Sequence, residues 1–422
     1  MADQYNVLVI GGGGREHAIV WALSKSPKIK KLYCLPGNAG IARLAECADI
    51  AATDIDGILA YLNLHKDINY VVVAPDDPLA MGLVDILNEK GYKTFGPKKD
   101  AAIIESSKAF AKSLMKKYNI PTADYQVFDN YDEADNYLKT AKFPLVIKAD
   151  GLALGKGVVI CQDYNSAQKA LADMMLNKKF GSSGDRVVIE EFLTGFEVSV
   201  LAFTDGQTLI PMPPSQDHKR VFDFDQGPNT GGMGAFAPSP KFTKDLQEKA
   251  YNTIFLPTIK ALQAEGREFC GVIYFGLIVN GSDIKVLEYN ARFGDPETQS
   301  VLPLLKTDLF EIFLAVNEKR LDKIDIQWRD SAAVCVVMAS GGYPESYKKG
   351  YPIEIGELDD NVLVFHAGTA LKDGRLVTNG GRVLGVTAVA SNLNEARDLA
   401  YKNISKINFK ESHFRKDIGI KL

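Results

Sequence analysis

The chain has 422 residues, of which 46% are hydrophobic and 24% charged, and its net charge is −4. A chain of this length exceeds what one hydrophobic core supports, so roughly three domains of ordinary size are expected. A slightly acidic protein of this composition has no general attraction for nucleic acid or anionic membranes, so any anion-binding site must be local.

The five cysteines are scattered without a C-x-x-C pair, which argues against disulfides and against a zinc site. The first residues lead directly into a strand-like segment, without a basic region followed by an apolar run. No apolar run is long enough to span a bilayer. We therefore expect a cytoplasmic protein with reduced cysteines, whose partners are small molecules rather than nucleic acid or membranes. We also expect a monomer, although the sequence alone does not determine the oligomeric state.

Residues 1–104 alternate short apolar strands with helices, which predicts an N-terminal doubly wound parallel-sheet domain. A strand at 5–10 is followed by a glycine run and then by a helix that ends near Ser24. Because backbone N–H groups and the helix dipole favour anions at such a turn, we predict that Gly12, Gly13, Gly14 and Arg15 bind a phosphate. A dinucleotide is disfavoured, since His17 stands where the third glycine of that fingerprint belongs. A tight turn without any ligand is the alternative.

Residues 105–320 are predicted to form a second domain, and a helix at 100–118 is expected where this domain begins. Further helices are expected at 242–266 and 302–319, and a strand pair turns at Asn280-Gly281. The segment 215–234 reads as a long, glycine-rich polar loop, and irregular backbone of this length usually binds something. Residues 321–325 are a candidate linker to a small C-terminal α/β domain at 328–422.

A flap subdomain is predicted at about 122–192, with strands at 125–128, 145–148, 158–161 and 186–191. The glycine-rich stretch inside it is not a Walker A loop, because Gly157 stands where a magnesium-binding Ser or Thr belongs. We expect instead a mobile flap between two antiparallel strands, whose N–H groups and Lys156 close over phosphates.

The segment 286–298 begins as a strand and ends in the turn Gly294-Asp295-Pro296. Side chains alternate along a strand, so Glu288 and Asn290 are predicted to lie on one face. One carboxylate oxygen beside one amide oxygen is a donor set for Mg²⁺, particularly when phosphates supply the other ligands. Arg292 follows on the same face and suits a phosphate or carboxylate. A solvated edge strand is the alternative.

Together these features resemble the ATP-grasp superfamily. Within it, the chain is similar to the phosphoribosylamine–glycine ligases (glycinamide ribonucleotide synthetases) of purine synthesis. The motifs that carry this resemblance occur in order along the whole chain: Gly13-Gly-Arg-Glu-His17, Pro36-Gly-Asn38, Gln216-Asp-His-Lys-Arg220, Gly227-Pro-Asn-Thr-Gly-Gly-Met-Gly234, Asn290-Ala-Arg-Phe-Gly-Asp-Pro-Glu-Thr298 and Phe414-Arg-Lys-Asp-Ile418. The resemblance implies that residues 105–320 form a two-lobed ATP-grasp domain.

The resemblance also implies an ATP site, in which Lys108 and Lys148 reach the α- and β-phosphates from opposite sides. Glu190 would accept from the adenine amino group, the backbone that follows it would read the adenine edge, and Glu197 would bind the ribose. The implied ATP-binding residues are Lys108, Lys148, Gly155, Lys156, Gly157, Glu190, Glu191, Phe192, Leu193 and Glu197. Glu288 and Asn290 would hold Mg²⁺, or Mn²⁺, bridging the phosphates.

For the reaction, the resemblance implies that glycine is activated by ATP as glycyl phosphate and transferred to 5-phosphoribosylamine. Arg292, Asp217 and Lys219 are the predicted catalytic residues, with Arg292 neutralising the phosphoryl group and Asp217 receiving the ammonium of glycine. The predicted substrate-binding residues are Gly12, Gly13, Gly14, Arg15, Asn38, Asp217, Asn229 and Arg292.

Three other interpretations remain. Another ATP-grasp ligase or carboxylase would use a different acid, such as bicarbonate or formate. A nucleotide-binding regulatory protein without catalysis would not need Lys148, Glu288, Asn290 and Arg292 together. A dinucleotide oxidoreductase conflicts with the failed fingerprint.

Overall fold

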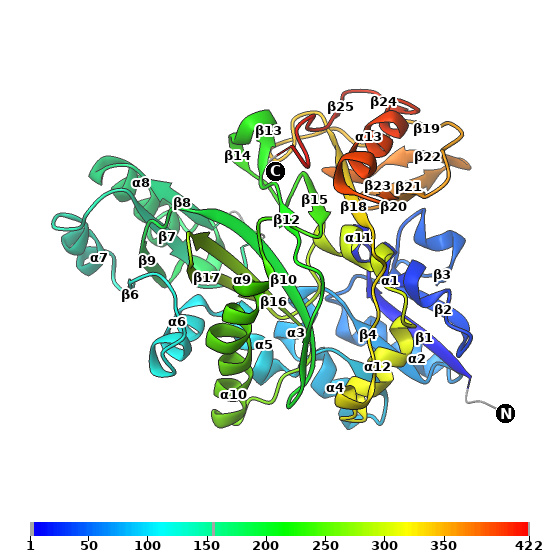
Figure 1. The fold of residues 1–422 in the computed structure, drawn as a ribbon, viewed down its shortest axis with the longest axis horizontal. Coiled ribbons are helices and arrows are strands. Elements are labelled where there is room, and N and C mark those ends of the chain that lie inside the picture. The colour runs from blue at the N-terminus through cyan, green and yellow to red at the C-terminus, as the bar shows by residue number, and fades with distance from the viewer. Residues whose placement is uncertain (1–3, 154–156, 421–422) are drawn as a thin grey trace.

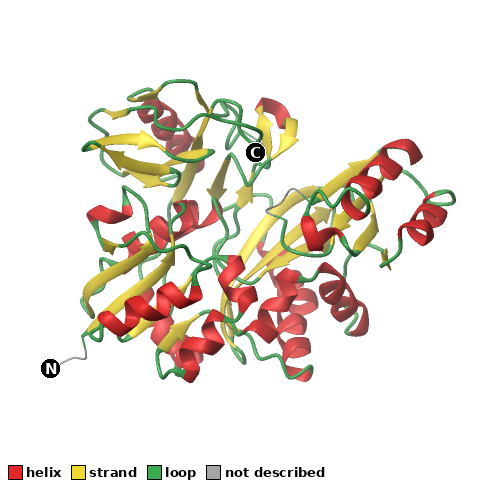
Figure 2. Cartoon of the chain, turned by 180° about the vertical axis from the view of Figure 1, so that it is seen from behind, coloured by secondary structure: helices red, strands yellow, loops and turns green. Residues whose placement is uncertain are grey.

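The structure is a computed structural model that describes residues 4–153 and 157–420. In Figure 1 the N-terminal sheet domain (blue) lies at the lower right, below the C-terminal domain (orange and red). The flap subdomain, which contains α7 (Tyr131–Leu138) and α8 (Tyr164–Met175), projects to the left. Figure 2 shows from behind how helices flank the N-terminal sheet and the long central sheet. The predicted α/β class, with a parallel sheet at the N-terminus, is confirmed.

The N-terminal sheet is parallel, in the order β3-β2-β1-β4-β5. Its order reverses between β1 and β4, and the loops at the carboxyl ends of such strands are where ligands bind in open α/β sheets. Residues 76–89 form two helices, because Gly82 adopts φ 91° and ends the first. The elements are β1 Tyr5–Gly11, α1 Gly14–Leu23, β2 Ile29–Pro36, β3 Glu46–Cys47, α2 Ile55–Leu64, β4 Tyr70–Val73, α3 Asp76–Met81, α4 Leu83–Glu89 and β5 Lys93–Phe95.

The helix expected at 100–118 is also interrupted. Ser107 takes an extended conformation and caps the second helix by accepting a hydrogen bond from the Phe110 N–H group. The interruption separates α5 Lys99–Ser106 from α6 Lys108–Lys117. It therefore places Lys108 at a helix N-terminus rather than in mid-helix.

The flap subdomain has the predicted strands, in an antiparallel sheet of order β6-β9-β7-β8. Its strands are β6 Tyr125–Phe128, β7 Leu145–Ala149, β8 Val158–Cys161 and β9 Val187–Glu191, and its helices are α7 Tyr131–Leu138 and α8 Tyr164–Met175. Buried Leu138, Leu171 and Met174 of the helices pack against Ile147 of the sheet. The subdomain thus has a core of its own.

The central antiparallel sheet has the order β11-β10-β16-β17. The helix expected at 242–266 contains a π-helical turn at Tyr251–Phe255 between two α-helices, and the helix expected at 302–319 begins only after Asp308, which caps it. The elements are β10 Phe196–Asp205, β11 Leu209–Pro211, α9 Lys244–Ala250, α10 Leu256–Ala264, β16 Cys270–Asn280, β17 Asp283–Asn290, α11 Glu297–Val301 and α12 Leu309–Asn317. Hydrophobic side chains of α10, including Ile259 and Leu262, cover one face of this sheet.

The segment 215–234, expected as a loop, contains short strands that extend the C-terminal sheet. That sheet has the order β12-β15-β18-β23-β20. It therefore joins strands from before and after the candidate linker at 321–325, and Leu321 of that linker is buried. The elements are β12 Gln216–Asp217, β13 Arg220–Phe222, β14 Gln226–Asn229, β15 Gly234–Ala237, β18 Ala332–Ser340, β19 Ile353–Ile355, β20 Val362–His366, β21 Thr369–Lys372, β22 Arg375–Thr378, β23 Arg382–Ala390, α13 Leu393–Ile404, β24 Ile407–Phe409 and β25 Ser412–His413. Within the described ranges, no helix has the length and apolar character needed to cross a membrane.

Candidate functional site

Strand β17 places Glu288 and Asn290 on one face, through a bulge that the sequence did not reveal. Val286 pairs with Leu277 and Glu288 pairs with Gly276, so Leu287 is an extra residue in the ladder. Val286 and Tyr289 both enter the hydrophobic core. An unbroken alternation from Val286 would have turned Glu288 and Asn290 into that core. The bulge reverses the alternation, as bulges beside functional sites do, and presents both polar side chains to the opposite face.

Glu288 is surrounded by ammonium groups. Lys219 Nζ lies 3.4 Å from Glu288 Oε1. Lys219 lowers the pKa of Glu288 to about 2, and Lys148 and Lys108 act in the same direction. The carboxylate is therefore ionised at neutral pH, as a metal ligand must be.

Glu105 of α5 fixes the segment that follows Glu288. The amide nitrogen of Asn290 donates to Glu105 Oε1 at 3.0 Å in the amide orientation that satisfies both groups. The Ala291 N–H group donates to Glu105 Oε2 at 2.7 Å, and Arg292 Nη2 lies 2.9 Å from Oε1. With its nitrogen held by Glu105, the Asn290 side chain can offer its oxygen to a cation.

A magnesium ion fits these donors only when a nucleotide completes its coordination. Among the described residues, no group of three or more His, Cys, Asp or Glu side chains could hold a metal ion. One carboxylate and one amide oxygen supply too few ligands for octahedral Mg²⁺, which commonly takes the rest from substrate phosphates and water. The residues present fit a metal ion that arrives with ATP.

Gly276 gives the Glu288 side chain its room. A Cβ atom at this position would lie 3.0 Å from Glu288 Cγ. We expect Gly276→Ala to displace the carboxylate and to raise the Mg²⁺ concentration for half-maximal ATP binding roughly tenfold. A Mg²⁺ titration of ATP binding measures this effect, and thermal unfolding should show a loss of stability of only about 1 kcal/mol. Unchanged Mg²⁺ dependence would show that Glu288 does not hold the ion.

Lys148 and Glu190 meet between the two sheets, beside β17. Lys148 Nζ donates to the Leu287 carbonyl at 3.1 Å and lies 3.0 Å from Glu190 Oε2. Lys112 Nζ lies 3.0 Å from the same Glu190 oxygen. Glu190 is buried, and its other oxygen, Oε1, has no hydrogen-bond partner. A buried, unpartnered carboxylate oxygen is costly and suits a ligand that brings an N–H donor, such as the adenine amino group.

The other predicted ATP residues lie around this pair. The Glu191 side chain is 2.8 Å from Lys285, and the Glu191 N–H group donates to the Asp124 carbonyl at 3.0 Å, so contact of Glu191 with a base edge stays a prediction. Phe192 and Leu193 lie in the connection between β9 and β10, and Glu197 Oε2 lies 3.2 Å from Lys219 Nζ.

The base of the flap is tied to α6. Lys108 Nζ donates to the Gly151 carbonyl at 3.1 Å, and burial lowers the pKa of Lys108. Asp150 Oδ1 accepts from the Ala109 N–H group at 2.6 Å. Gly157 follows the flap and is buried, whereas Gly155 and Lys156 lie outside the described residues. Lys108 and the flap are thus joined at one corner of the site.

Arg292 lies in an acidic setting. Besides Glu105, it has Asp76 at 3.8 Å, and its Nη1 donates to the Phe293 carbonyl at 3.1 Å. Although burial opposes it, the carboxylates of Glu105 and Asp76 raise the pKa of Arg292. Its Nε atom is buried without a hydrogen-bond partner. The charge is permanent and one donor remains unused.

Asp217 and Glu297 form a pair of acids near Lys219. Burial, and then the neighbouring Glu297, raise the pKa of Asp217. Asp217 Oδ1 accepts from the His218 N–H group at 2.6 Å, and Glu297 Oε1 accepts from the Ser199 hydroxyl at 3.1 Å. Such a pair attracts a cation. Asn229 ends β14, where it pairs with Arg220 in a separate hairpin.

The N-terminal glycine loop packs tightly against other parts of the chain. The Gly13 N–H group donates to Glu16 Oε2 at 2.7 Å, and the Arg15 N–H group donates to Asp295 Oδ2 at 3.2 Å. Cβ atoms at Gly12 and Gly14 would lie within 2.5 Å of other groups, so close packing alone explains both glycines. A phosphate would have to displace these carboxylates, and phosphate binding here stays a prediction.

The side chains of Arg15 and Asn38 are engaged in internal bonds. Arg15 is buried, and its guanidinium bonds to Glu16 Oε1 at 2.6 Å and to the Phe293 carbonyl at 3.1 Å. Asn38 Nδ2 donates to the carbonyls of Gly12 at 2.9 Å and His366 at 2.8 Å. Both residues join the N-terminal domain to other parts of the chain, and their contact with a substrate stays a prediction.

Several residues of this site escaped the sequence-based prediction: Glu105, Gly276, Glu297, Ser199 and Arg382. Glu105 could have been noticed as a lone acid on the apolar face of a predicted helix, beside Ala101, Ala102 and Ile104. For Arg382, which donates to the Asp295 carbonyl at 2.9 Å, the sequence holds no such signal.

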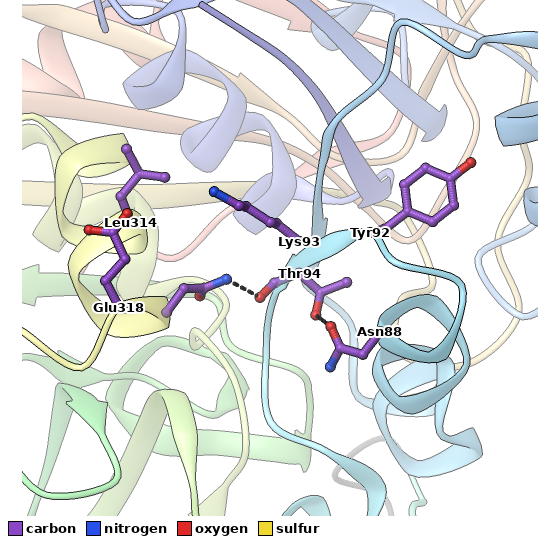
Figure 3. Close-up of a pocket in the computed structure, with 7 residues that line it drawn as sticks. Asn88, Tyr92, Lys93, Thr94, Leu314 and Glu318 are labelled. Atoms are coloured by element: carbon purple, nitrogen blue, oxygen red, sulfur yellow. Dashed lines mark hydrogen bonds between the residues drawn. The ribbon is translucent and has the colours of Figure 1, made fainter. Parts of the chain in front are cut away.

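A separate hollow lies between β5 and α12 (Figure 3), with a volume of about 260 Å³. Asn317 Nδ2 donates to the Thr94 carbonyl at 2.8 Å across it, and Thr94 bonds to Asn88. It shares no residue with the Glu288 site, and Asn88, Thr94 and Asn317 in its lining already bond to one another.

Comparisons with known proteins cover the whole chain. Models of the three phosphoribosylglycinamide synthetase domains match residues 5–105 (N domain), 106–298 (ATP-grasp domain) and 333–421 (C domain). The phosphoribosylamine–glycine ligase of Caldanaerobacter subterraneus is 49% identical over 98% of this chain and 99% of its own length.

Solved structures agree with these matches. The phosphoribosylamine–glycine ligase of Thermotoga maritima has a TM-score of 0.83 at 34% identity, covering 98% of this chain and all of that one. A biotin carboxylase domain from Hydrogenobacter thermophilus, in complex with ADP and its magnesium salt, has a TM-score of 0.77 at 15% identity. It covers 97% of this chain and 91% of its own, and it shows likeness of fold alone.

Proposed function

This chain belongs to the phosphoribosylamine–glycine ligase family, and from that premise we propose that it joins glycine to 5-phosphoribosylamine while ATP becomes ADP and phosphate. The product is glycinamide ribonucleotide, an early compound of purine synthesis. Glu288 and Asn290 on one face of β17, beside the carbonyl that binds Lys148, are the observation that carries the proposal. The family match extends over the full chain that holds this arrangement.

ATP is needed because a carboxylate does not acylate an amine, since oxide would have to leave. In the proposed first step, a glycine carboxylate oxygen attacks the γ-phosphorus, and the bond to the ADP oxygen breaks. The amino group of phosphoribosylamine then attacks the carbonyl carbon of glycyl phosphate, loses a proton, and phosphate leaves. The protein supplies position and charge neutralisation rather than a nucleophile.

ATP would lie between the flap sheet and the central sheet. Lys148 and Lys108 supply positive charge for the phosphates, and the unpartnered oxygen of Glu190 is suited to the adenine amino group. Glu288 and Asn290 would hold Mg²⁺, which neutralises phosphate charge when bound. ADP with its magnesium salt in the structurally similar carboxylase domain supports Mg²⁺, and Mn²⁺ remains an alternative ion.

Glycine would bind between the acid pair and Arg292. Asp217, with Glu297 beside it, would accept hydrogen bonds from the ammonium group. Burial and then Glu297 raise the pKa of Asp217, and a bound ammonium group would offset both effects. Glu105 holds Arg292 just beyond the end of β17, next to Asn290. There Arg292 would neutralise the transferring phosphoryl group. Lys219 would supply a further charge there.

The third substrate is phosphoribosylamine. We propose that the amine substrate lies at the carboxyl ends of β1 and β2, near Gly12, Arg15 and Asn38, and that Asn229 of β14 also contacts it. We further propose that the protein works as a cytoplasmic monomer on small molecules.

The experiment that tests this proposal pairs phosphoribosylamine with glycine, formate or bicarbonate in turn and follows ADP release in the presence of Mg²⁺. We expect release that requires both glycine and the amine, together with formation of glycinamide ribonucleotide. Release with formate or bicarbonate, and none with glycine, would assign the chain to another ATP-grasp activity.

A further inference from the structure

Lys219 holds together two carboxylates that the proposed reaction requires for other ligands. Its ammonium nitrogen lies 3.2 Å from Glu197 Oε2 and 3.4 Å from Glu288 Oε1. The three residues come from separate elements, since Glu197 is on β10, Glu288 on β17, and Lys219 follows β12. One ammonium group is therefore shared by two carboxylates from different strands.

The backbone of Lys219 is fixed, while its side chain can move. The Lys219 carbonyl accepts from the Thr230 N–H group at 2.7 Å and from the Thr230 hydroxyl at 2.8 Å. The lysine side chain is a flexible four-carbon stem that ends in a compact point charge. It can therefore exchange one anionic partner for another without movement of the loop.

The charge around Glu288 disfavours a metal ion that arrives alone. Lys219 Nζ already lies 3.4 Å from Glu288 Oε1, and Lys148 Nζ donates to the carbonyl of the preceding residue, Leu287, at 3.1 Å. A free divalent cation at Glu288 would have to displace Lys219 and would be repelled by the nearby ammonium groups. ATP brings several negative charges, which offset the lysines and supply further oxygen ligands.

We infer that Lys219 is the counter-ion of Glu288 in the nucleotide-free protein, and that the metal ion replaces it there only together with ATP. The released ammonium group then has the phosphates as its new partners. The inference rests on the proposed function in one respect, namely that Glu288 is the metal ligand. It gives Lys219 a role in the binding of the metal ion and ATP, which precedes the chemical step.

The test is a titration of the full-length protein with Mn²⁺ alone, without nucleotide, followed by electron paramagnetic resonance of the free ion. We expect weak binding by the wild type and an affinity roughly tenfold higher in Lys219→Met. Lys219→Arg keeps the charge and should bind as weakly as the wild type. Lys285→Met is the matched control, because it removes a lysine of β17 that pairs with Glu191 at 2.8 Å, and its Mn²⁺ affinity should not change.

Two results would overturn the inference: equal Mn²⁺ affinity in Lys219→Met and the wild type, or a gain in affinity that persists in Lys219→Met/Glu288→Gln. Thermal unfolding without metal verifies that each variant is folded. Glycine-dependent ADP release by the wild type, measured separately, distinguishes failure of this inference from failure of the proposed function.

Discussion

Glu288→Gln is expected to lower the turnover of glycine-dependent ADP release by roughly 10³-fold, a loss comparable to that of other charged groups in phosphoryl transfer. The substitution keeps the shape of the side chain but removes the negative charge that faces Lys219, Lys148 and Lys108. Without that charge, the site would lose its proposed anionic metal ligand, and the three ammonium groups would lose a carboxylate that they share. Steady-state kinetics at increasing Mg²⁺ measures the effect.

Asp283→Asn is the matched control, because Asp283 lies on the same strand but is exposed at the hairpin end. Its turnover should equal that of the wild type. If Glu288→Gln retained more than a tenth of wild-type turnover at every Mg²⁺ concentration, Glu288 would not be a ligand of the catalytic ion.

Arg292→Met is expected to lower turnover by roughly 10³-fold while Mg·ATP still binds. In the proposed reaction Arg292 would neutralise the transferring phosphoryl group, and its contact with Glu105 lies outside the contacts proposed for the adenine and for the metal ion. Single-turnover kinetics, combined with a separate measurement of ATP binding, separates the chemical step from binding.

The same substitution leaves the carboxylates of Glu105 and Asp76 without their arginine, so we expect a loss of stability of about 3 kcal/mol. Arg292→Lys keeps the charge and should recover most of the stability, but little of the turnover, because a lysine lacks the planar fork. Wild-type turnover in Arg292→Met would exclude a catalytic role for this residue.

Local patterns in the sequence were sufficient for much of the fold. Short apolar strands that alternate with helices predicted the parallel N-terminal sheet, and similar short apolar segments predicted the four strands of the flap subdomain, because these patterns depend on nearby residues. The break at Ser107 inside the helix predicted at 100–118 was missed, because a cap interrupts a continuous periodic pattern there. Strands β12 and β15 were missed because they depend on the pairing of β15 with β18, which lies about a hundred residues later in the chain.

In the candidate site, too, features that depend on local sequence were predicted and features that depend on distant residues were missed. Spacing along one strand predicted that Glu288 and Asn290 share a face, and the structure agrees. It does so through the bulge at Leu287, which depends on pairing with β16 and is not encoded in β17 alone. Glu105 was missed for a similar reason, because its contacts with residues 290–292 are long-range. For the glycine loop, a local motif predicted a phosphate site, whereas packing against Gly37 and Gln299 accounts for the glycines.

The most direct test of this account is a crystal structure of the protein with Mg²⁺ and a non-hydrolysable ATP analogue. We expect a magnesium ion about 2.1 Å from an oxygen of Glu288 and from the oxygen of Asn290, in contact with the β- and γ-phosphates. An ion bound to the phosphates through other residues, with Glu288 still paired to Lys219, would contradict it.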